Sequence, residues 1–238
     1  MTLPLYLAMT DWETTEAADF SGKFAYMACH FAPYSNGLTD LPTFLPSGSL
    51  LIINDRIPVT NHDPHCIVDQ LQQFCQERNP CGLLLDLQRH GVAQTQRIVE
   101  MIIENITLPV GVSAPYASNL PCAVFAELPP LHKPLCEHLE QWQGRPIWLE
   151  LSKQTSIYTV TEEGCDIKDI QSCTLPLTHH EAQLHCHYQI EMQPDSVVFT
   201  ISRTEEDLLA LLEESKNCGV QMAIGLYQEF SQNKRLFL

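Results

Sequence analysis

The chain has 238 residues, and its 13 basic and 29 acidic residues give a formal net charge of -16. This charge repels phosphate backbones and anionic membrane surfaces, so we expect neither nucleic acid nor membranes as partners, although an ordinary solvated surface gives the same charge. The length suits one α/β barrel or two small domains, and 45% apolar residues are enough for a sizeable core.

The ten cysteines form no C-x-x-C pair and mostly lie inside apolar runs. We therefore expect reduced core residues, because buried cysteine behaves as a small hydrophobic side chain. The first residues include no basic region, which makes a poor secretion signal, and no later stretch has the roughly 18 apolar residues of a membrane helix. A cytoplasmic location is the expectation.

Short apolar runs alternate with helical patterns in the first half of the chain. An acidic segment after the first run predicts a weak helix to Gly22, and residues 31–49, with three prolines, predict a loop. Asp63 before Pro64 is a helix start, and apolar residues then recur at helical spacing. A further helix with an apolar stripe covers 98–106. The predicted strands are 3–9, 24–30, 50–54 and 82–87.

The second half continues the alternation but interrupts it once. Helices are predicted over 131–142 and, from a capping box at Thr204 and Asp207, to Asn217. Between them, 157–160, 185–191 and 197–201 read as β segments without intervening helices. The remaining predicted strands are 109–113, 123–127, 147–151 and 220–227, and the first two are joined by a connection too short for a proper helix.

Eight rounds of strand and helix, with strands that are apolar throughout, predict a parallel sheet buried on both faces. The predicted fold class is α/β, a (β/α)8 TIM-like barrel in a single domain of residues 1–238, with a β-rich insertion at 155–202 after strand seven. In the alternative assignment, 197–201 is itself a barrel strand and the barrel is irregular.

Catalytic groups in such barrels lie at the carboxyl ends of the strands. These ends are rich in carboxylates, amides and aromatic side chains, which suit acid/base cleavage of a glycosidic bond and the stacking of sugar rings. Any acidic barrel, however, has carboxylates at its rim. The candidate substrate-binding residues are Trp12, Tyr34, Asn54, Gln88, Arg89, Tyr116, Tyr227 and Glu229, and the candidate catalytic residues are Asp86, Glu127 and Glu150.

The strand that contains Asp86 resembles the fourth-strand signature of chitinase-like glycoside hydrolases of family 18, D-G-x-D-x-D-x-E. The family's glycine falls on Gly82 and its last aspartate on Asp86, while its first two aspartates fall on Cys81 and Leu84. Its catalytic glutamate falls on Gln88. An amide cannot donate a proton as a general acid, so the mechanism of that family cannot run here unchanged.

If the protein still catalyses hydrolysis, Glu127 and Glu150 are the carboxylates that could replace the catalytic glutamate of the family. Burial near apolar neighbours such as Phe125 would raise their pKa toward a useful range. Gln88 could then orient a substrate amide or hydroxyl, with Asp86 holding it. An ion pair with Lys133 is the structural alternative for Glu127.

Histidines offer a further possibility, a metal site. His185 and His187 would share one face of a strand, and His62 and His65 flank a carboxylate, but a structural role fits both groups better than a metal centre. The pair His179 and His180 reads as part of a solvated polar loop. No nucleophile elbow and no nucleotide-binding motif occurs, so neither a metal nor any other cofactor is expected.

Three functions remain open at this point. The first is a barrel resembling glycoside hydrolases that acts on or binds a small carbohydrate in a cleft at the strand ends. The second is a carbohydrate-binding or interaction module that has lost the catalytic acid, which Gln88 favours. The third is a metal-dependent hydrolase that uses the histidines. The sequence predicts no oligomeric state.

Overall fold

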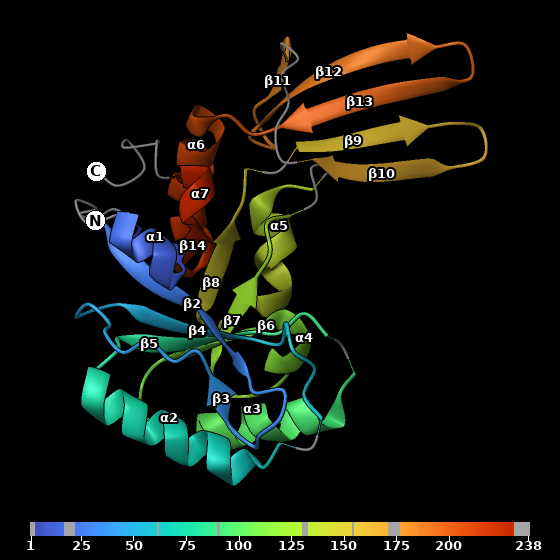
Figure 1. The fold of residues 1–238 in the computed structure, drawn as a ribbon. Coiled ribbons are helices and arrows are strands. Elements are labelled where there is room, and N and C mark those ends of the chain that lie inside the picture. The colour runs from blue at the N-terminus through green and yellow to red at the C-terminus, as the bar shows by residue number, and fades with distance from the viewer. Residues whose placement is uncertain are drawn as a thin grey trace.

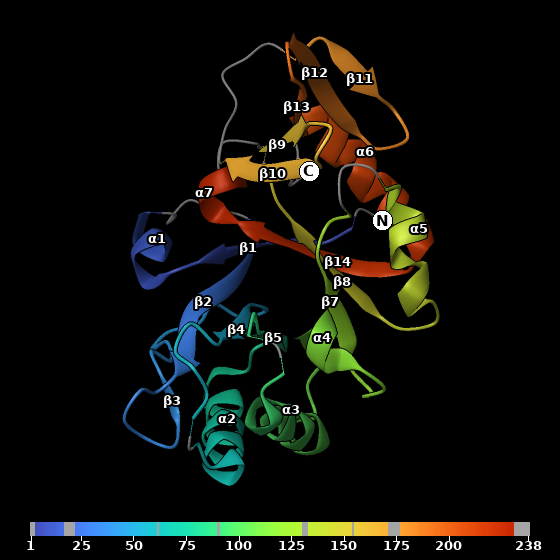
Figure 2. The same cartoon turned by 90° about the vertical axis from the view of Figure 1, so that its right-hand side faces the viewer.

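The computed structural model describes residues 3–16, 22–60, 62–89, 91–129, 133–153, 155–170 and 177–230. A ring of parallel strands with helices outside it forms the body, and a second, antiparallel sheet projects from one end (Figures 1 and 2). Within the ranges just given, no helix is both long enough and apolar enough to cross a membrane.

Within the described residues, the ring consists of eight parallel strands. Its first and last strands pair with each other, and the first also pairs with the second, so the sheet closes on itself. The predicted eight-stranded barrel is therefore confirmed. Its strands are β1 (Leu5–Met9), β2 (Lys23–Phe31), β4 (Leu50–Asn54), β5 (Gly82–Asp86), β6 (Val110–Ser113), β7 (Ala123–Ala126), β8 (Ile147–Leu151) and β14 (Val220–Leu226).

The barrel strands are almost entirely apolar because both of their faces are covered. In β5, Leu84 points into the barrel interior, while Leu83 and Leu85 belong to the larger core between the strands and the helices. Polar, partly exposed residues stand at the carboxyl ends, as Asn54 does in β4 and Asp86 in β5. The apolar interior thus gives way to polar side chains at this end of the ring.

Trp148 of β8 fills the barrel interior near the amino-terminal ends of the strands, where it is 1% exposed. Gly111 of β6 lies against its ring, and a Cβ atom at residue 111 would be only 2.2 Å from the Cε3 atom of Trp148. Glycine is therefore required at this position, because any side chain would displace the indole.

Helices of unequal length cover the outside of the ring (Figure 2). The longest two, α2 (Pro64–Arg78) and α3 (Ala93–Asn105), pack side by side. Asp63 caps α2 by accepting a hydrogen bond from the backbone of His65, and Thr204 and Asp207 form the capping box of the next long helix, both as predicted. The others are α1 (Asp11–Glu16), α4 (Ala114–Ala117), α5 (Leu135–Leu139), η1 (Glu140–Trp142), α6 (Glu205–Ser215), η2 (Lys216–Cys218) and α7 (Tyr227–Phe230).

Some predicted bounds differ from the observed ones. The connection between β6 and β7 holds only the single turn α4, as expected, whereas the helix predicted over 131–142 consists of α5 and η1, and residues 131 and 132 lie outside the described ranges. The predicted loop at 31–49 contains the two-residue strand β3 (Leu38–Thr39), which pairs with β2. The helix predicted to reach Gly22 is described only as far as Glu16.

The β-rich insertion after strand seven is confirmed as an antiparallel sheet between β8 and β14 (Figure 1). The alternative that placed 197–201 in the barrel is wrong, because these residues lie in the insertion. Two of its strands were not predicted: β10, whose residues are mostly exposed, and β11, which was taken for a loop. The sheet has the order β10 (Cys165–Ile170), β9 (Thr155–Val160), β13 (Ser196–Ser202), β12 (Cys186–Gln193) and β11 (His179–Glu181).

The prediction that the cysteines are reduced core residues is wrong for four of the nine that lie in the described ranges, and Cys173 lies outside those ranges. Cys136 of α5 and Cys218 of η2 form a disulfide, although 82 residues separate them in the chain. The two elements are packed together by the fold, which the spacing of cysteines in the sequence could not reveal. Cys66 and Cys165 are exposed rather than buried.

Candidate site at the barrel mouth

The carboxyl ends of β5, β7 and β8 bring four polar side chains to one cavity of about 300 Å³. Asp86 is the last residue of β5 and Gln88 lies two residues beyond it, while Glu127 directly follows β7 and Glu150 lies within β8. We call this cavity the mouth cleft. Its remaining lining residues are Leu87, Ser113, Ala114, Pro115, Phe125, His138 and Trp142.

The chain segment after β5 is held in place by a buried carboxylate that sequence reasoning did not select. Asp55, 2% exposed, accepts hydrogen bonds from the backbone N–H groups of Gln88 (2.9 Å) and Arg89 (2.8 Å). The Ser113 hydroxyl accepts a third, at 2.8 Å from the backbone N–H of Leu87. Gln88 therefore stands on a fixed backbone, which is how a binding group is preorganised.

Gln88 and Asp86 are in direct contact. The Gln88 Nε2 atom donates a hydrogen bond to Asp86 Oδ1 at 3.2 Å. This bond fixes the orientation of the amide and leaves its carbonyl oxygen available to accept from a ligand. The predicted partnership of these two side chains is thus present as a contact.

Two carboxyl groups of the cleft, those of Glu150 and Asp86, have a raised pKa, chiefly because they are buried. Burial raises the pKa of Glu150 to about 7, and the charges of Asp86, Glu127 and Glu229 add to the rise. Burial also raises the pKa of Asp86, with further contributions from Asp55 and Glu127, although the hydrogen bond from Gln88 opposes the shift. A carboxyl group with a pKa near 7 is partly protonated at neutral pH and can donate a proton.

Two aromatic side chains that the sequence did not single out also line the cleft. The rings of His138 and Trp142 meet edge to face with centroids 5.6 Å apart. Burial lowers the pKa of His138, an effect partly opposed by a hydrogen bond with the backbone of Glu127. Trp142 ends the helix predicted over 131–142, and the sequence gives no separate sign that its ring reaches the mouth. The indole adds a flat apolar surface to the lining of the cleft.

One other candidate residue lies deep in the barrel beneath the cleft. Asn54 lines a smaller hollow of about 70 Å³ together with Asp86 and Glu150, and its Nδ2 atom donates to the carbonyl of Met27 at 3.0 Å. The hollow is otherwise mostly apolar. Because Asp86 and Glu150 line both spaces, the small hollow extends the mouth cleft inward.

The remaining candidates do not line either space. Trp12 and Tyr34 are 75% and 99% exposed. Arg89 is exposed and donates from Nε to the carbonyl of Asp55 at 3.1 Å. Tyr116, buried, donates its hydroxyl to the carbonyl of Arg89. Two others lie on α7: Tyr227 packs against the core, and Glu229 accepts from the backbone of Lys153 at 2.8 Å.

The ion pair between Glu127 and Lys133 that the sequence offered as an alternative is not observed. Lys133 instead pairs with Glu137 at 3.8 Å. The histidine groups also differ from expectation. His62 is buried and its Nε2 atom lies 2.9 Å from the carbonyl of Ala32. His185 precedes β12 and does not share a strand face with His187. Among the described residues, none of the groups that could hold a metal lines the mouth cleft.

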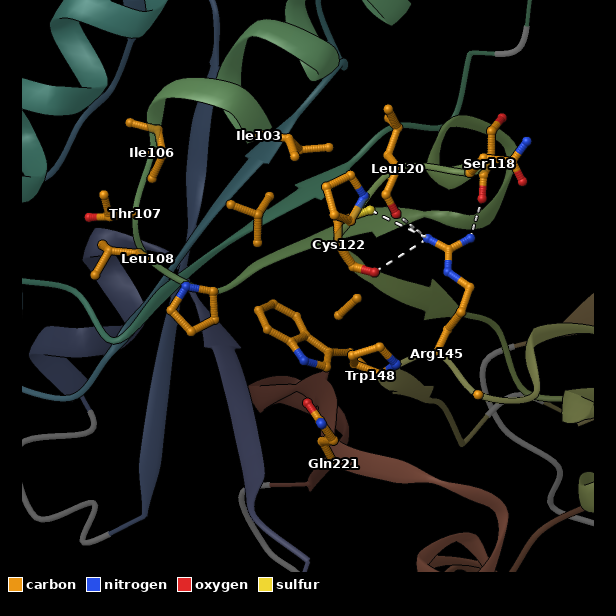
Figure 3. A pocket seen from close by; sticks show the side chains of 17 residues that line it. Ile103, Ile106, Thr107, Leu108, Ser118, Leu120, Cys122, Arg145, Trp148 and Gln221 are labelled. Atoms are coloured by element: carbon orange, nitrogen blue, oxygen red, sulfur yellow. Dashed lines mark hydrogen bonds between the residues drawn. The ribbon is translucent and has the colours of Figure 1, made fainter.

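A larger hollow of about 820 Å³, which we call the basal hollow, lies at the opposite end of the barrel (Figure 3). Its walls include Ile103, Leu108 and Trp148, and its one cationic group is Arg145. The guanidinium donates to the carbonyls of Leu120 (3.0 Å), Cys122 (3.3 Å), Ser118 and Ala117. Because this end of a parallel barrel carries stability rather than chemistry, the mouth cleft is the better candidate site.

Comparison with known proteins supports the fold but not a close relative. No family model and no curated protein matches the sequence. The solved structure of the spore cortex-lytic enzyme SleL from Bacillus cereus is similar, with a TM-score of 0.61 and 9% identity over 99% of this chain and 73% of that one.

Two plant proteins are similar in structure as well. The chitinase-like agglutinin RobpsCRA from Robinia pseudoacacia has a TM-score of 0.61 at 11% identity, covering 92% of this chain and 93% of that one. A class V chitinase from Nicotiana tobaccum, solved as a glutamate-to-glutamine mutant in complex with NAG4, has a TM-score of 0.59 at 9% identity, covering 94% and 93%. The fold is therefore similar to that of family 18 chitinases and chitinase-like proteins.

Proposed function

We propose that this protein binds a small carbohydrate of the amino-sugar type in the mouth cleft. The observation that carries the proposal is the gathering of Asp86, Gln88, Glu127 and Glu150 with the Trp142 ring in one cavity. Carboxylates and an amide can hydrogen-bond hydroxyl and acetamido groups, and the indole offers an apolar face to a sugar ring. The volume lies at the lower end of the usual range for ligand sites, which suits a short ligand.

Gln88 favours binding over cleavage by the family mechanism. It stands where the family signature has its catalytic glutamate, and it keeps the hydrogen-bonding capacity of that residue without its acidity. Similar folds support the same view, because one of them is an agglutinin and another is a glutamate-to-glutamine mutant that holds NAG4. A chain of similar fold therefore holds a sugar oligomer with a glutamine in place of one of its glutamates.

Hydrolysis is the second candidate, and one observation favours it. Glu150 has a pKa of about 7 and shares the cleft with Asp86, so it could protonate a leaving group at neutral pH. Glu127, exposed at the rim, would be the second carboxylate. The metal-dependent hydrolase has no comparable support in this cleft.

Calorimetric titration with short N-acetylglucosamine oligomers tests the binding proposal. We expect Gln88→Ala to weaken binding about tenfold, the usual effect of one lost hydrogen bond between neutral groups. Gln76→Ala, an exposed glutamine on α2, is the matched control and should bind as the wild type does. Absence of binding by the wild type, or equal binding by both variants, would refute the proposal.

Release of nitrophenol from aryl glycosides of amino sugars tests hydrolysis separately. If Glu150 is the acid, Glu150→Gln should lower turnover by about a hundredfold or more while leaving binding measurable, and Glu127→Gln should have a smaller effect. Binding by the wild type without any turnover would leave the binding function and exclude the enzyme.

A further inference from the structure

The antiparallel insertion and the start of α6 bring three potential metal ligands together at a place separate from the mouth cleft. His180 of β11 and His187 of β12 are direct cross-strand partners, so their side chains lie on one face of the sheet, and their ring centroids are 4.6 Å apart. Asp207, in the first turn of α6, faces both rings. We call these three residues the histidine cluster.

We propose that the histidine cluster binds a divalent transition-metal ion of the zinc class. Each residue offers one ligand atom, and the three atoms lie within 4.8 Å of one another. Asp207 Oδ1 is 3.1 Å from His180 Nε2, and Asp207 Oδ2 is 2.7 Å from His187 Nδ1. Around a tetrahedral zinc ion, neighbouring ligand atoms are about 3.4 Å apart, so side-chain shifts of roughly one ångström would suffice.

The chemistry of the three ligands selects the kind of ion. Neutral imidazole nitrogens suit Zn²⁺, Co²⁺, Ni²⁺ and Cu²⁺, whereas Ca²⁺ and Mg²⁺ prefer sites built from oxygen atoms. A metal ion binds the unprotonated nitrogen of an imidazole, so its binding competes with protons and weakens at acid pH.

Asp207 is already oriented as a metal ligand would need to be. Its side chain is 2% exposed, and its Oδ2 atom accepts hydrogen bonds from the Thr204 backbone at 2.8 Å and the Thr204 hydroxyl at 2.9 Å. Such second partners fix ligand geometry in metal sites. The first turn of α6 also contains Glu205 and Glu206, which add negative charge that attracts a cation.

The two histidine side chains of the cluster are accessible to solvent. The His187 side chain is 30% exposed and that of His180 is 48% exposed, so an ion can enter from solvent. Two imidazoles and one carboxylate leave at least one coordination position for water or an external ligand. The ion would join the β11–β12 hairpin to the start of α6.

A neighbouring contact on the same hairpin provides a matched control. His185 Nε2 lies 2.5 Å from Glu214 Oε2, an ion pair with only one imidazole. Glu214 also lies close to Cys136 and Cys218, but their sulfur atoms form the disulfide and offer no thiolate. Replacing His185 therefore removes a histidine–carboxylate contact without touching the proposed ligands.

The test is a calorimetric titration of the chelator-treated full chain with Zn²⁺, without reductant. We expect one tightly bound ion per chain, affinity about a hundredfold weaker in His180→Ala and in His187→Ala, and unchanged affinity in His185→Gln. Saturating Zn²⁺ should raise the Tm of the wild type by roughly 5 °C, and circular dichroism should show that all variants are folded.

Titration with Co²⁺ identifies the ligands independently. Coordination by imidazole and carboxylate gives only weak visible absorption, whereas a thiolate ligand adds an intense near-ultraviolet band. A thiolate band would assign the ion to exposed cysteines such as Cys66 or Cys165 and overturn the proposal. Equal Zn²⁺ affinity in the wild type and both alanine variants, or the absence of tight binding, would overturn it as well.

Discussion

At the base of the barrel, four backbone carbonyls surround the guanidinium of Arg145, whereas at the mouth Asp86 and Glu150 face each other in a cleft whose lining includes no lysine or arginine. The basal hollow is the larger of the two, yet the guanidinium of Arg145 that lines it already has hydrogen-bond partners. The mouth cleft is smaller and keeps carboxyl groups whose pKa values are raised. Buried carboxyl groups with raised pKa values, and not volume, therefore mark the end of the barrel where chemistry is possible.

The largest effect on stability is expected from a substitution that adds a side-chain atom against Trp148 at the base of the barrel. Gly111→Ala would place a Cβ atom 2.2 Å from the Trp148 ring, so we expect the free energy of unfolding to fall by roughly 3 kcal/mol or more. Denaturant titration measures this loss. Sugar binding by the molecules that remain folded should be unchanged, because Gly111 does not line the mouth cleft.

A double-mutant cycle shows whether the contact with Trp148 is the cause. In a Trp148→Phe background the smaller ring should make room, so Gly111→Ala should cost less there. The same cost in both backgrounds would mean that the contact with Trp148 is not the cause. Weakened sugar binding in Gly111→Ala would mean that the two ends of the barrel are not independent.

The next largest effect is the change in stability with pH that the ionisation of Glu150 in the mouth cleft causes. The pKa of Glu150 is about 7 in the folded protein and 4.5 in an ordinary environment, so the folded state holds this proton more tightly. Stability must then decrease as the pH rises from about 4.5 to 7, and the cost above pH 7 is about 3 kcal/mol. Glu150→Gln removes the ionisation, and we expect it to stabilise the protein at pH 8 but not at pH 4.

The free energy of unfolding of both proteins across this pH range is the measurement. Glu140→Gln, which neutralises an exposed carboxylate on η1, serves as the control and should change stability little at either pH. If the wild type and Glu150→Gln follow parallel pH curves, the pKa of Glu150 is not raised in the folded protein.

The sequence was sufficient to predict the parts of the mouth that depend on strand ends. Asp86, Glu127 and Glu150 follow apolar runs, and a closed parallel ring brings such positions together. Trp142 and His138 could not be predicted in the same way, because they reach the cleft from the segment after β7, whose path depends on tertiary packing. Asp55 directly follows the predicted strand end, but nothing in the sequence distinguishes a buried acceptor of backbone hydrogen bonds from a rim carboxylate.

The fold, too, could be predicted from the sequence only in part. The barrel was predictable because its strands are buried on both faces and therefore continuously apolar. In the insertion, β10 is mostly exposed, so its sequence lacks the apolar alternation that marks a half-buried strand. The β11 strand is only three residues long and begins with two histidines, which reads as a loop. The Cys136–Cys218 pairing depends on the packing of α5 near η2 and has no local signal.

A smaller effect on the mouth is expected from Asp55, which shapes the cleft without lining it. Asp55→Asn keeps one acceptor oxygen but turns an amino group toward the second backbone N–H, so we expect a loss of roughly 1–3 kcal/mol in unfolding free energy. Because Gln88 would be less fixed, sugar affinity should fall as well. Asp69→Asn on α2, an exposed aspartate, is the control, and unaltered affinity in Asp55→Asn would show that the mouth does not need this support.

The smallest effect is expected at the two exposed aromatic residues that the sequence suggested as binding groups. Trp12 and Tyr34 are 75% and 99% exposed and do not line the mouth cleft, so replacing either with alanine should change the unfolding free energy by less than about 0.5 kcal/mol. A ligand confined to the cleft should bind these variants as it binds the wild type. A longer oligomer could still extend to one of them, and weaker binding of the longer ligand alone would show that the mouth continues onto the rim. Calorimetric titrations with ligands of increasing length measure this difference, and weaker binding of even the shortest ligand would mean that the site is centred outside the cleft.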